Sequence, residues 1–187
     1  ALTATLRRLG IAPGDRCVSY MPNIPPTVVA LLATASVGAI WSSASPDMGP
    51  VSVLDRFRQI EPKVLYAVDG YRYGGKDFDR REVVRELVRQ LPSLRAVVFV
   101  PYLDPAATLG GLDGAAAAGA PQVVTWDDAL ARPAACEFTP VPFEHPLWIV
   151  YSSGTTGMPK PIVHGHGGTV LETLKTNLLH LDVGESD

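Results

Sequence analysis

The residues best suited to chemistry lie in one ten-residue segment near the carboxyl end of the chain. Tyr151–Lys160 contains two glycines, four Ser or Thr hydroxyls and one lysine, and it directly follows an apolar stretch. Glycines let a backbone turn tightly and direct its N–H groups at an anion. Hydroxyls add hydrogen-bond donors, and a lysine adds a full positive charge. This combination predicts a binding site for a polyphosphate.

Seven residues of this segment are candidates for phosphate binding. They are Ser152, Ser153, Gly154, Thr155, Thr156, Gly157 and Lys160. Their spacing is not that of a Walker A loop, which has four residues between its glycines and then Gly-Lys-Ser/Thr. It is not a nucleophile elbow either, because that turn reads Gly-x-Ser-x-Gly. The alternative interpretation is a hairpin loop rich in Ser, Thr and Gly that holds no ligand.

Regular elements must position this segment. Apolar strands are expected before and after it, at 147–151 and 161–164, followed by a last helix at 168–181. Other strands are predicted at 16–20, 39–42, 63–68 and 94–100, and helices at 25–38, 51–60 and 77–91, with a polar loop at 69–75. Strands that alternate with helices imply crossover connections. The predicted fold is therefore α/β, with a mostly parallel sheet flanked by helices.

Two further features of the upstream chain can be interpreted. The stretch 104–121 is rich in Ala, Gly and Pro and is interpreted as a surface insertion. Thr125 is expected to cap a short helix, since a threonine hydroxyl can accept a hydrogen bond from a free N–H of the first turn.

Composition excludes several classes of protein. The 187 residues are 47% apolar and 19% charged, with a net charge of −3. This is typical of a globular chain and argues against disorder and against a nucleic-acid partner. Cys17 and Cys136 suggest a reduced, cytoplasmic context without a disulfide. The apolar run 28–40 is shorter than the roughly 20 residues of a membrane span, so none is expected.

The segment 151–160 resembles a known signature. The AMP-forming acyl-CoA synthetases, also called adenylate-forming enzymes, bind phosphates through a loop that runs aromatic, Ser/Thr, Ser, Gly, Ser/Thr, Thr, Gly, any residue, Pro, Lys. Every specified position of that signature is matched by this chain. The resemblance implies the fold of the large amino-terminal domain of these enzymes.

The residues around the loop narrow the resemblance to one branch. Residues 160–168 (KPIVHGHGG) look like the acetoacetyl-CoA synthetases, where most members of the superfamily have Gly after the lysine. Residues 20–25 (YMPNIP), 41–47 (WSSASPD) and 54–63 (LDRFRQIEPK) look like the same branch. The resemblance runs over nearly the whole chain and is weakest at 104–121.

This resemblance implies a ligase that works in two steps. A carboxylate attacks the α-phosphate of ATP, which is accompanied by Mg²⁺, and pyrophosphate leaves. The coenzyme A thiol then attacks the acyl-adenylate and releases AMP. The substrate implied here is acetoacetate, with acetate, propionate or another short acid as the alternative. The seven loop residues are expected to stabilise the leaving pyrophosphate, whereas the catalytic lysine of such enzymes lies in a carboxy-terminal domain.

A second, weaker similarity concerns coenzyme A. Short-chain synthetases have a Gly-x-Arg-x-Gly-Arg stretch near its nucleotide, and residues 70–76 (GYRYGGK) are similar. Arg72 and Lys76 are therefore candidates for contacts with coenzyme A phosphates. A solvated basic loop is an equally good interpretation. His145, His164, His166 and His180 lack the usual zinc spacings, so no metal site is expected, and His164 is interpreted as a hydrogen-bonded residue at a strand end near the nucleotide.

The resemblance also implies that residues 1–187 are part of an amino-terminal AMP-binding domain. The chain begins at Ala1, and the residues that complete such a site are not found in it. The carboxy-terminal domain is expected to be supplied by the rest of the same polypeptide, and the piece alone is expected to be inactive. An alternative of another class is a non-catalytic nucleotide-binding module.

Overall fold

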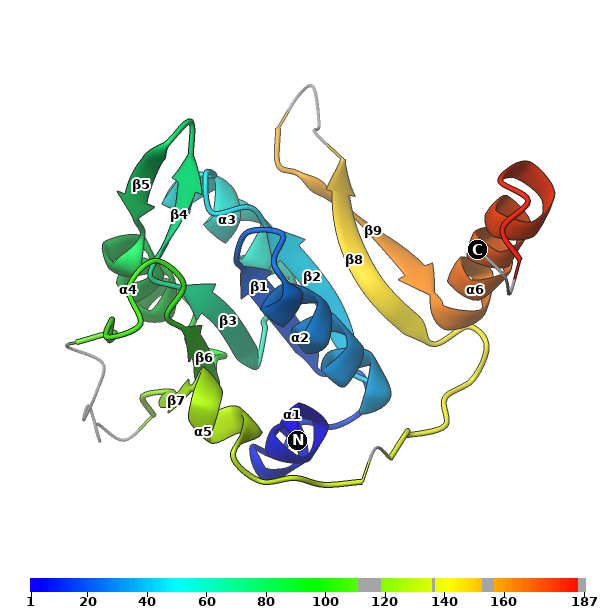
Figure 1. Cartoon of the computed structure of the whole chain (residues 1–187), viewed down its shortest axis with the longest axis horizontal. Coiled ribbons are helices and arrows are strands. Elements are labelled where there is room, and N and C mark those ends of the chain that lie inside the picture. The colour runs from blue at the N-terminus through cyan, green and yellow to red at the C-terminus, as the bar shows by residue number, and fades with distance from the viewer. Residues whose placement is uncertain (111–118, 136, 153–156, 185–187) are drawn as a thin grey trace.

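A computed structural model describes residues 1–110, 119–135, 137–152 and 157–184 (Figure 1). Within these residues, seven strands form one sheet in the order β7-β6-β3-β1-β2-β8-β9, and β4 and β5 form a separate hairpin. The strands are β1 (Arg16–Tyr20), β2 (Ile40–Ala44), β3 (Val64–Val68), β4 (Gly70–Tyr73), β5 (Lys76–Asp79), β6 (Ala96–Val100), β7 (Gln122–Thr125), β8 (Pro146–Ser152) and β9 (Lys160–Gly165). The helices are α1 (Leu2–Arg8), α2 (Pro25–Ser36), α3 (Pro50–Phe57), α4 (Arg81–Gln90), α5 (Trp126–Leu130) and α6 (His166–Lys175), with short helical turns η1 (Arg58–Ile60) and η2 (Thr176–His180).

The sheet is mostly parallel, as predicted. In the seven-stranded sheet, as far as the structure describes it, every neighbouring pair but one is parallel. The exception is β8 with β9, which are antiparallel. Parallel pairs need a long crossover, whereas an antiparallel pair needs only a short loop. The phosphate-loop segment is such a loop, because it joins β8 directly to β9.

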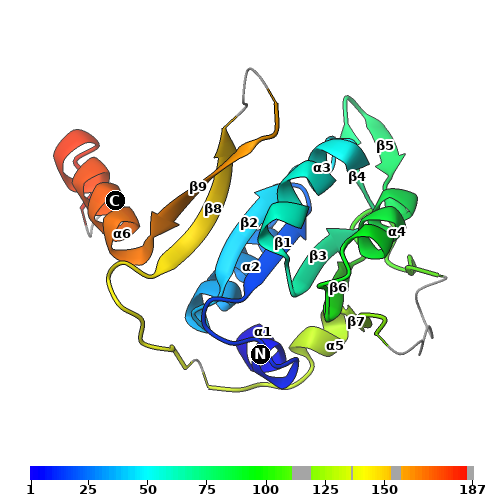
Figure 2. The same cartoon turned by 180° about the vertical axis from the view of Figure 1, so that it is seen from behind.

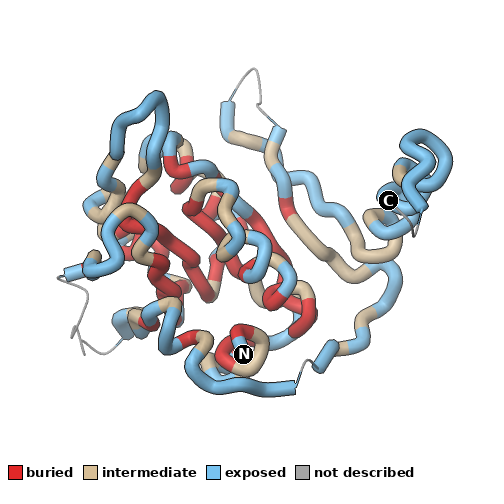
Figure 3. Tube along the Cα trace, in the orientation of Figure 1, coloured by how far each residue is buried: buried red, intermediate tan, exposed pale blue. Residues whose placement is uncertain are grey.

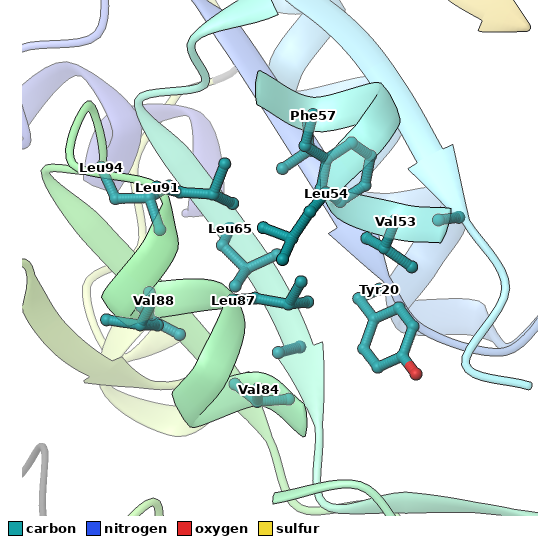
Figure 4. Close-up of a cluster of buried hydrophobic side chains, with 14 of the residues drawn as sticks. Tyr20, Val53, Leu54, Phe57, Leu65, Val84, Leu87, Val88, Leu91 and Leu94 are labelled. Atoms are coloured by element: carbon teal, nitrogen blue, oxygen red, sulfur yellow. The ribbon is translucent and has the colours of Figure 1, made fainter. Parts of the chain in front are cut away.

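Helices cover both faces of the sheet. One core contains Tyr20, Phe57, Leu65 and Leu87 and lies under α3 and α4 (Figures 2 and 4). The other core lies under α1, α2 and α5 and includes Leu6. The buried residues concentrate in the central strands, while α6 and much of β9 are exposed (Figure 3).

The structure differs from the predictions at the polar segment after β3. Residues 70–79 form the β4–β5 hairpin rather than a loop, and the helix expected from residue 77 begins at Arg81. Gly74 and Gly75 make the turn with φ of +56° and +75°, which glycine adopts without strain. The hairpin strands are short and polar, so they lack the alternation that marks a half-buried strand.

Three other expectations can be compared with the structure. Thr125 caps α5, because its hydroxyl oxygen accepts a hydrogen bond from the Asp128 N–H at 3.1 Å. The insertion predicted at 104–121 is described only in part, and its Leu109 is buried in the core under α3 and α4. The last helix begins at His166, two residues earlier than expected.

No helix among the described residues is long and apolar enough to cross a membrane.

Candidate functional site

The ends of the phosphate-loop segment are held together by the β8–β9 hairpin. Ser152 ends β8, Lys160 begins β9, and the two residues are direct partners in the antiparallel register. Residues directly opposite each other in such a pair project from the same face of the sheet. The side chains of Ser152 and Lys160 therefore project from the same face of the hairpin, and both residues are exposed.

The centre of the segment is only partly described. Ser153, Gly154, Thr155 and Thr156 lie outside the described residues. Gly157 is described and has a φ of +109°, a backbone conformation that side chains other than glycine rarely adopt. The prediction of a glycine-dependent turn therefore fits this position.

Lys160 is exposed and, among the residues that the structure describes, it forms no ion pair. A lysine ammonium and a serine hydroxyl can both donate hydrogen bonds to an anionic oxygen. The described part of the loop thus fits a phosphate ligand, and the fit rests on charge and on the donors of Ser152 and Lys160.

The opposite face of the hairpin is fixed to α3. The Tyr151 hydroxyl donates a hydrogen bond to the Arg56 carbonyl at 2.7 Å, and the Arg56 guanidinium lies 5.8 Å from the centre of the Tyr151 ring. Burial raises the pKa of Tyr151 to about 12, so its hydroxyl remains a donor at neutral pH. The β8 limb of the loop is thereby attached to the helix above one core.

The β9 limb is attached to the same helical segment. The Gln59 side-chain amide donates a hydrogen bond to the Pro159 carbonyl at 3.0 Å, and Pro159 immediately precedes Lys160. Gln59 and Arg56 are not among the site residues predicted from the sequence. Their only signal was that both lie in the run 54–63 that carries the family resemblance.

A cavity of about 430 Å³ lies beside the β8 limb. Strands β2 and β8 are paired at only two positions, Trp41 with Trp148 and Ser42 with Ile149. The cavity is lined by Leu31, Trp41, Ser43, Met48, Arg56, Trp148, Ile149, Val150 and Tyr151. It therefore adjoins the anchored side of the phosphate-loop hairpin and offers both aromatic and polar walls.

The second pair of candidates, Arg72 and Lys76, lies at the tip of the β4–β5 hairpin. Arg72 pairs with Asp77 in the register, and Lys76 pairs with Tyr73. Successive residues of a strand point to opposite faces, so Arg72 and Lys76 lie on opposite faces of the hairpin. The two candidates are close in the chain but do not converge on one face.

Asp77 already engages Arg72. The Arg72 guanidinium donates two hydrogen bonds to the Asp77 carboxylate, at 2.6 and 2.9 Å. The hydrogen bond from Arg72 holds the pKa of Asp77 below its ordinary value, so the carboxylate is charged at neutral pH. Lys76 is exposed and has no acidic partner among the described residues.

Ring contacts and hydrogen bonds hold the base of the β4–β5 hairpin against the rest of the domain. Tyr71 and Phe78 stack with ring centres 5.0 Å apart, and the Arg80 guanidinium lies 5.2 Å from the Tyr71 ring centre. Arg80 also donates to the Pro46 carbonyl at 2.8 Å. The buried Asp69 carboxylate, just before β4, accepts hydrogen bonds from the backbone N–H groups of residues 102–104. These contacts fix the base of the hairpin, and the tip with Arg72 and Lys76 projects from it.

The four histidines are spread over the carboxyl-terminal part of the chain: His145 directly precedes β8, His164 lies on β9, His166 begins α6 and His180 ends η2. His164 lies opposite Trp148, with ring centres 6.4 Å apart, near the end of β9 that is remote from Lys160. His164 thus lies near a strand end, as expected, at the end of β9 away from the phosphate-loop segment. His145 and His166 have ring centres 5.8 Å apart, and burial lowers the pKa of His166. In the parts of the chain that the structure describes, no group of three acidic, His or Cys side chains could hold a metal ion.

Comparisons with known proteins show which family and fold this chain resembles. The model of a family described as "AMP-binding enzyme" matches residues 1–186. Acetoacetyl-CoA synthetase from Macaca fascicularis is 43% identical over 98% of this chain, and acetoacetyl-coenzyme A synthetase from Rhizobium meliloti (strain 1021) is 46% identical over 100% of it. The solved structure of acetoacetyl-CoA synthetase from Streptomyces lividans is 54% identical, with a TM-score of 0.88 over 98% of this chain. The chain spans 27%, 28% and 26% of these three proteins respectively, or about a quarter of each.

Proposed function

This chain belongs to the AMP-binding enzyme family, and from that premise we propose that the protein containing it is an ATP-dependent acid–thiol ligase that activates acetoacetate. The ligase would form acetoacetyl-CoA through an acyl-adenylate and release pyrophosphate and AMP. The observation that carries the proposal is the complete phosphate-loop signature at 151–160, with Ser152 and Lys160 side by side at its base. The choice of acid is supported by relatives that are named as acetoacetyl-CoA synthetases at 43–54% identity.

The loop would act on the leaving group of the first step. A carboxylate oxygen of the acid bonds to the α-phosphorus of ATP, the bond to the bridging oxygen breaks, and negative charge builds up on pyrophosphate. Fixed N–H and hydroxyl donors and a nearby cation stabilise such charge without having to reorganise. We assign this role to Ser152, Lys160 and the intervening residues Ser153, Gly154, Thr155, Thr156 and Gly157.

Mg²⁺ would enter this site with ATP rather than be held by the chain alone. Phosphate oxygens are common ligands of Mg²⁺ in enzymes that transfer phosphoryl groups, and the ion neutralises charge on them. The contribution of these residues is to bind and orient the phosphates on the exposed face of the hairpin. The adenine pocket, the Mg²⁺ ligands and the catalytic lysine would come from the rest of the polypeptide.

Coenzyme A would meet the β4–β5 hairpin in the second step, in which the thiol sulfur bonds to the acyl carbon and AMP leaves. Lys76 supplies a cation that has no acidic partner within the described ranges, and Arg72 supplies a guanidinium that already has a carboxylate partner. We propose that Lys76 makes the first contact with a coenzyme A phosphate. Arg72 would bind a phosphate only when its hydrogen bonds to Asp77 are broken. A location in the cytoplasm is also proposed, and a free, buried Cys17 is compatible with it.

The test uses the full-length protein and a panel of acids. We expect AMP release to be fastest with acetoacetate, slower with acetate and propionate, and dependent on ATP and coenzyme A. The 187-residue chain alone is expected to give no acid-dependent exchange of pyrophosphate into ATP.

Three outcomes would change the assignment. A response to acetate or propionate but not to acetoacetate would move it to another short-chain ligase. ATP binding without turnover on any acid would favour the non-catalytic nucleotide-binding module. Exchange catalysed by the 187-residue chain alone would contradict the need for the rest of the polypeptide.

A further inference from the structure

Gln59 connects a buried helical segment to the last residue before Lys160. Its side chain lies on η1, directly after α3, and is exposed. The Pro159 carbonyl that it contacts is 100 positions away in the sequence. Proline has no backbone N–H, so this carbonyl is the one backbone group through which Pro159 can be held by a hydrogen bond.

The orientation of the Gln59 amide follows from its surroundings. Its nitrogen lies 2.6 Å from the Asp55 carbonyl oxygen and 3.0 Å from the Pro159 carbonyl oxygen. The NH₂ group has two hydrogens, so it can donate to both carbonyls at once. The reversed amide would place an oxygen against two carbonyl oxygens, which is repulsive. Gln59 is therefore a double donor that joins its own helix to the loop.

The helical segment that carries Gln59 is itself firmly placed. Val53, Leu54, Phe57 and Ile60 are buried in the core under α3 and α4. The same segment holds the β8 limb through the hydrogen bond from Tyr151 to the Arg56 carbonyl. Both limbs of the phosphate-loop hairpin are thus tied to one rigid element, and Gln59 holds the limb from which Lys160 projects.

We propose that Gln59 is a positioning residue of the phosphate loop. It holds the Pro159 carbonyl and thereby fixes the backbone position from which Lys160 reaches the phosphates of ATP. This inference rests on the proposed phosphate role of Lys160. Gln59 is not placed in contact with ATP, so its effect must pass through Lys160.

The matching experiment measures ATP binding by the full-length protein. Gln59→Met keeps the length of the side chain but removes both donors, and we expect the Kd for ATP to rise about threefold to tenfold, as for the loss of one hydrogen bond. The KM values for acetoacetate and coenzyme A and the midpoint of thermal unfolding should stay unchanged. Gln122→Met, on the exposed edge strand β7, is the control and should leave the Kd unchanged.

A double-mutant cycle then separates positioning from a general structural role. In the Lys160→Ala background, Gln59→Met should change the Kd for ATP by less than about twofold, because the group that it positions has been removed. An unchanged Kd in the wild-type background, or an equal rise in both backgrounds, would overturn the inference. If Lys160→Ala alone leaves the Kd for ATP unchanged, the proposed phosphate role of Lys160 is wrong, and the inference about Gln59 is wrong as a consequence.

Discussion

At the level of single residues, the cations proposed to bind phosphates differ in what surrounds them. Lys160 and Lys76 are exposed and lack an acidic partner among the described residues, whereas the Arg72 guanidinium forms two hydrogen bonds with Asp77. A lysine acts as a point charge, whereas a guanidinium binds a phosphate best with two parallel hydrogen bonds. Arg72 can bind a phosphate in that way only if Asp77 gives up the same edge of the guanidinium.

Removing the charge of Asp77 is therefore expected to strengthen coenzyme A binding. Asp77→Asn weakens the competition for Arg72, so the KM for coenzyme A should fall about twofold to fivefold, the range of an exposed ion pair. The KM for ATP should not change, because the hairpin and the phosphate loop are separate elements. Steady-state kinetics of the full-length protein provide the measurement.

Glu172→Gln is the control, because it breaks the exposed Glu172–Lys175 ion pair of α6 with the same change of charge. It should leave the KM for coenzyme A as it is. A KM that is unaltered in Asp77→Asn as well would mean that Arg72 does not contact coenzyme A.

At the level of elements, the β4–β5 hairpin depends on a glycine at its base. A Cβ atom added to Gly70 would lie 2.3 Å from the Phe78 carbonyl oxygen and 2.5 Å from a Leu103 methyl carbon. Because the nearest atom belongs to the backbone of the partner strand, it cannot turn away as a flexible side chain could. Gly70 therefore allows the close approach of β4 and β5.

Gly70→Ala is expected to lower the free energy of unfolding by about 1–3 kcal/mol, the usual cost of overpacking. Loosening the hairpin should also raise the KM for coenzyme A, since Arg72 and Lys76 lie at its tip. Chemical denaturation and kinetics of the full-length protein would measure the two effects. Gly168→Ala in α6, where a Cβ atom meets no atom within 4 Å, should not destabilise the protein. Equal stability of the two variants would contradict the close approach.

At the level of the whole molecule, burial decides which elements could be predicted from the sequence. Strands β3 and β6 are entirely buried, so they are visible as apolar runs, and α4 shows its buried stripe of Val84, Leu87 and Val88. Strand β7 has only four residues and follows the Ala-, Gly- and Pro-rich stretch, so no sequence pattern predicts it. No pattern predicts the β4–β5 hairpin either, because its strands are polar.

The part of the candidate site that could be predicted from the sequence is the part formed by consecutive residues. The signature at 151–160 is continuous in the sequence, whereas the pairing of Ser152 with Lys160 is seen only in the hairpin register. The contacts of Tyr151 with Arg56 and of Gln59 with Pro159 join residues 95 and 100 positions apart. No local pattern predicts such contacts, because they arise only when α3 packs beside β8.

The apolar surface of the molecule is unevenly distributed. Large apolar side chains are exposed on α2, β9, α6 and η2, including Leu32, Val163, Leu171 and Leu179. Extended exposed apolar surface on a folded chain marks an interaction site. Since the relatives are about four times longer, the rest of the polypeptide is the proposed partner for this surface.

The proposed ligase activity depends most directly on Lys160 as a cation that binds the phosphates of ATP. The decisive measurement is acetoacetate-dependent exchange of pyrophosphate into ATP by the full-length protein carrying Lys160→Ala, beside Lys175→Ala as a lysine control on α6. We predict that Lys160→Ala lowers kcat/KM for ATP by about tenfold to a hundredfold, the loss of one hydrogen bond to a charged group, while Lys175→Ala remains as active as the wild type. Equal activity of the two variants would contradict the assignment of this loop to phosphate binding.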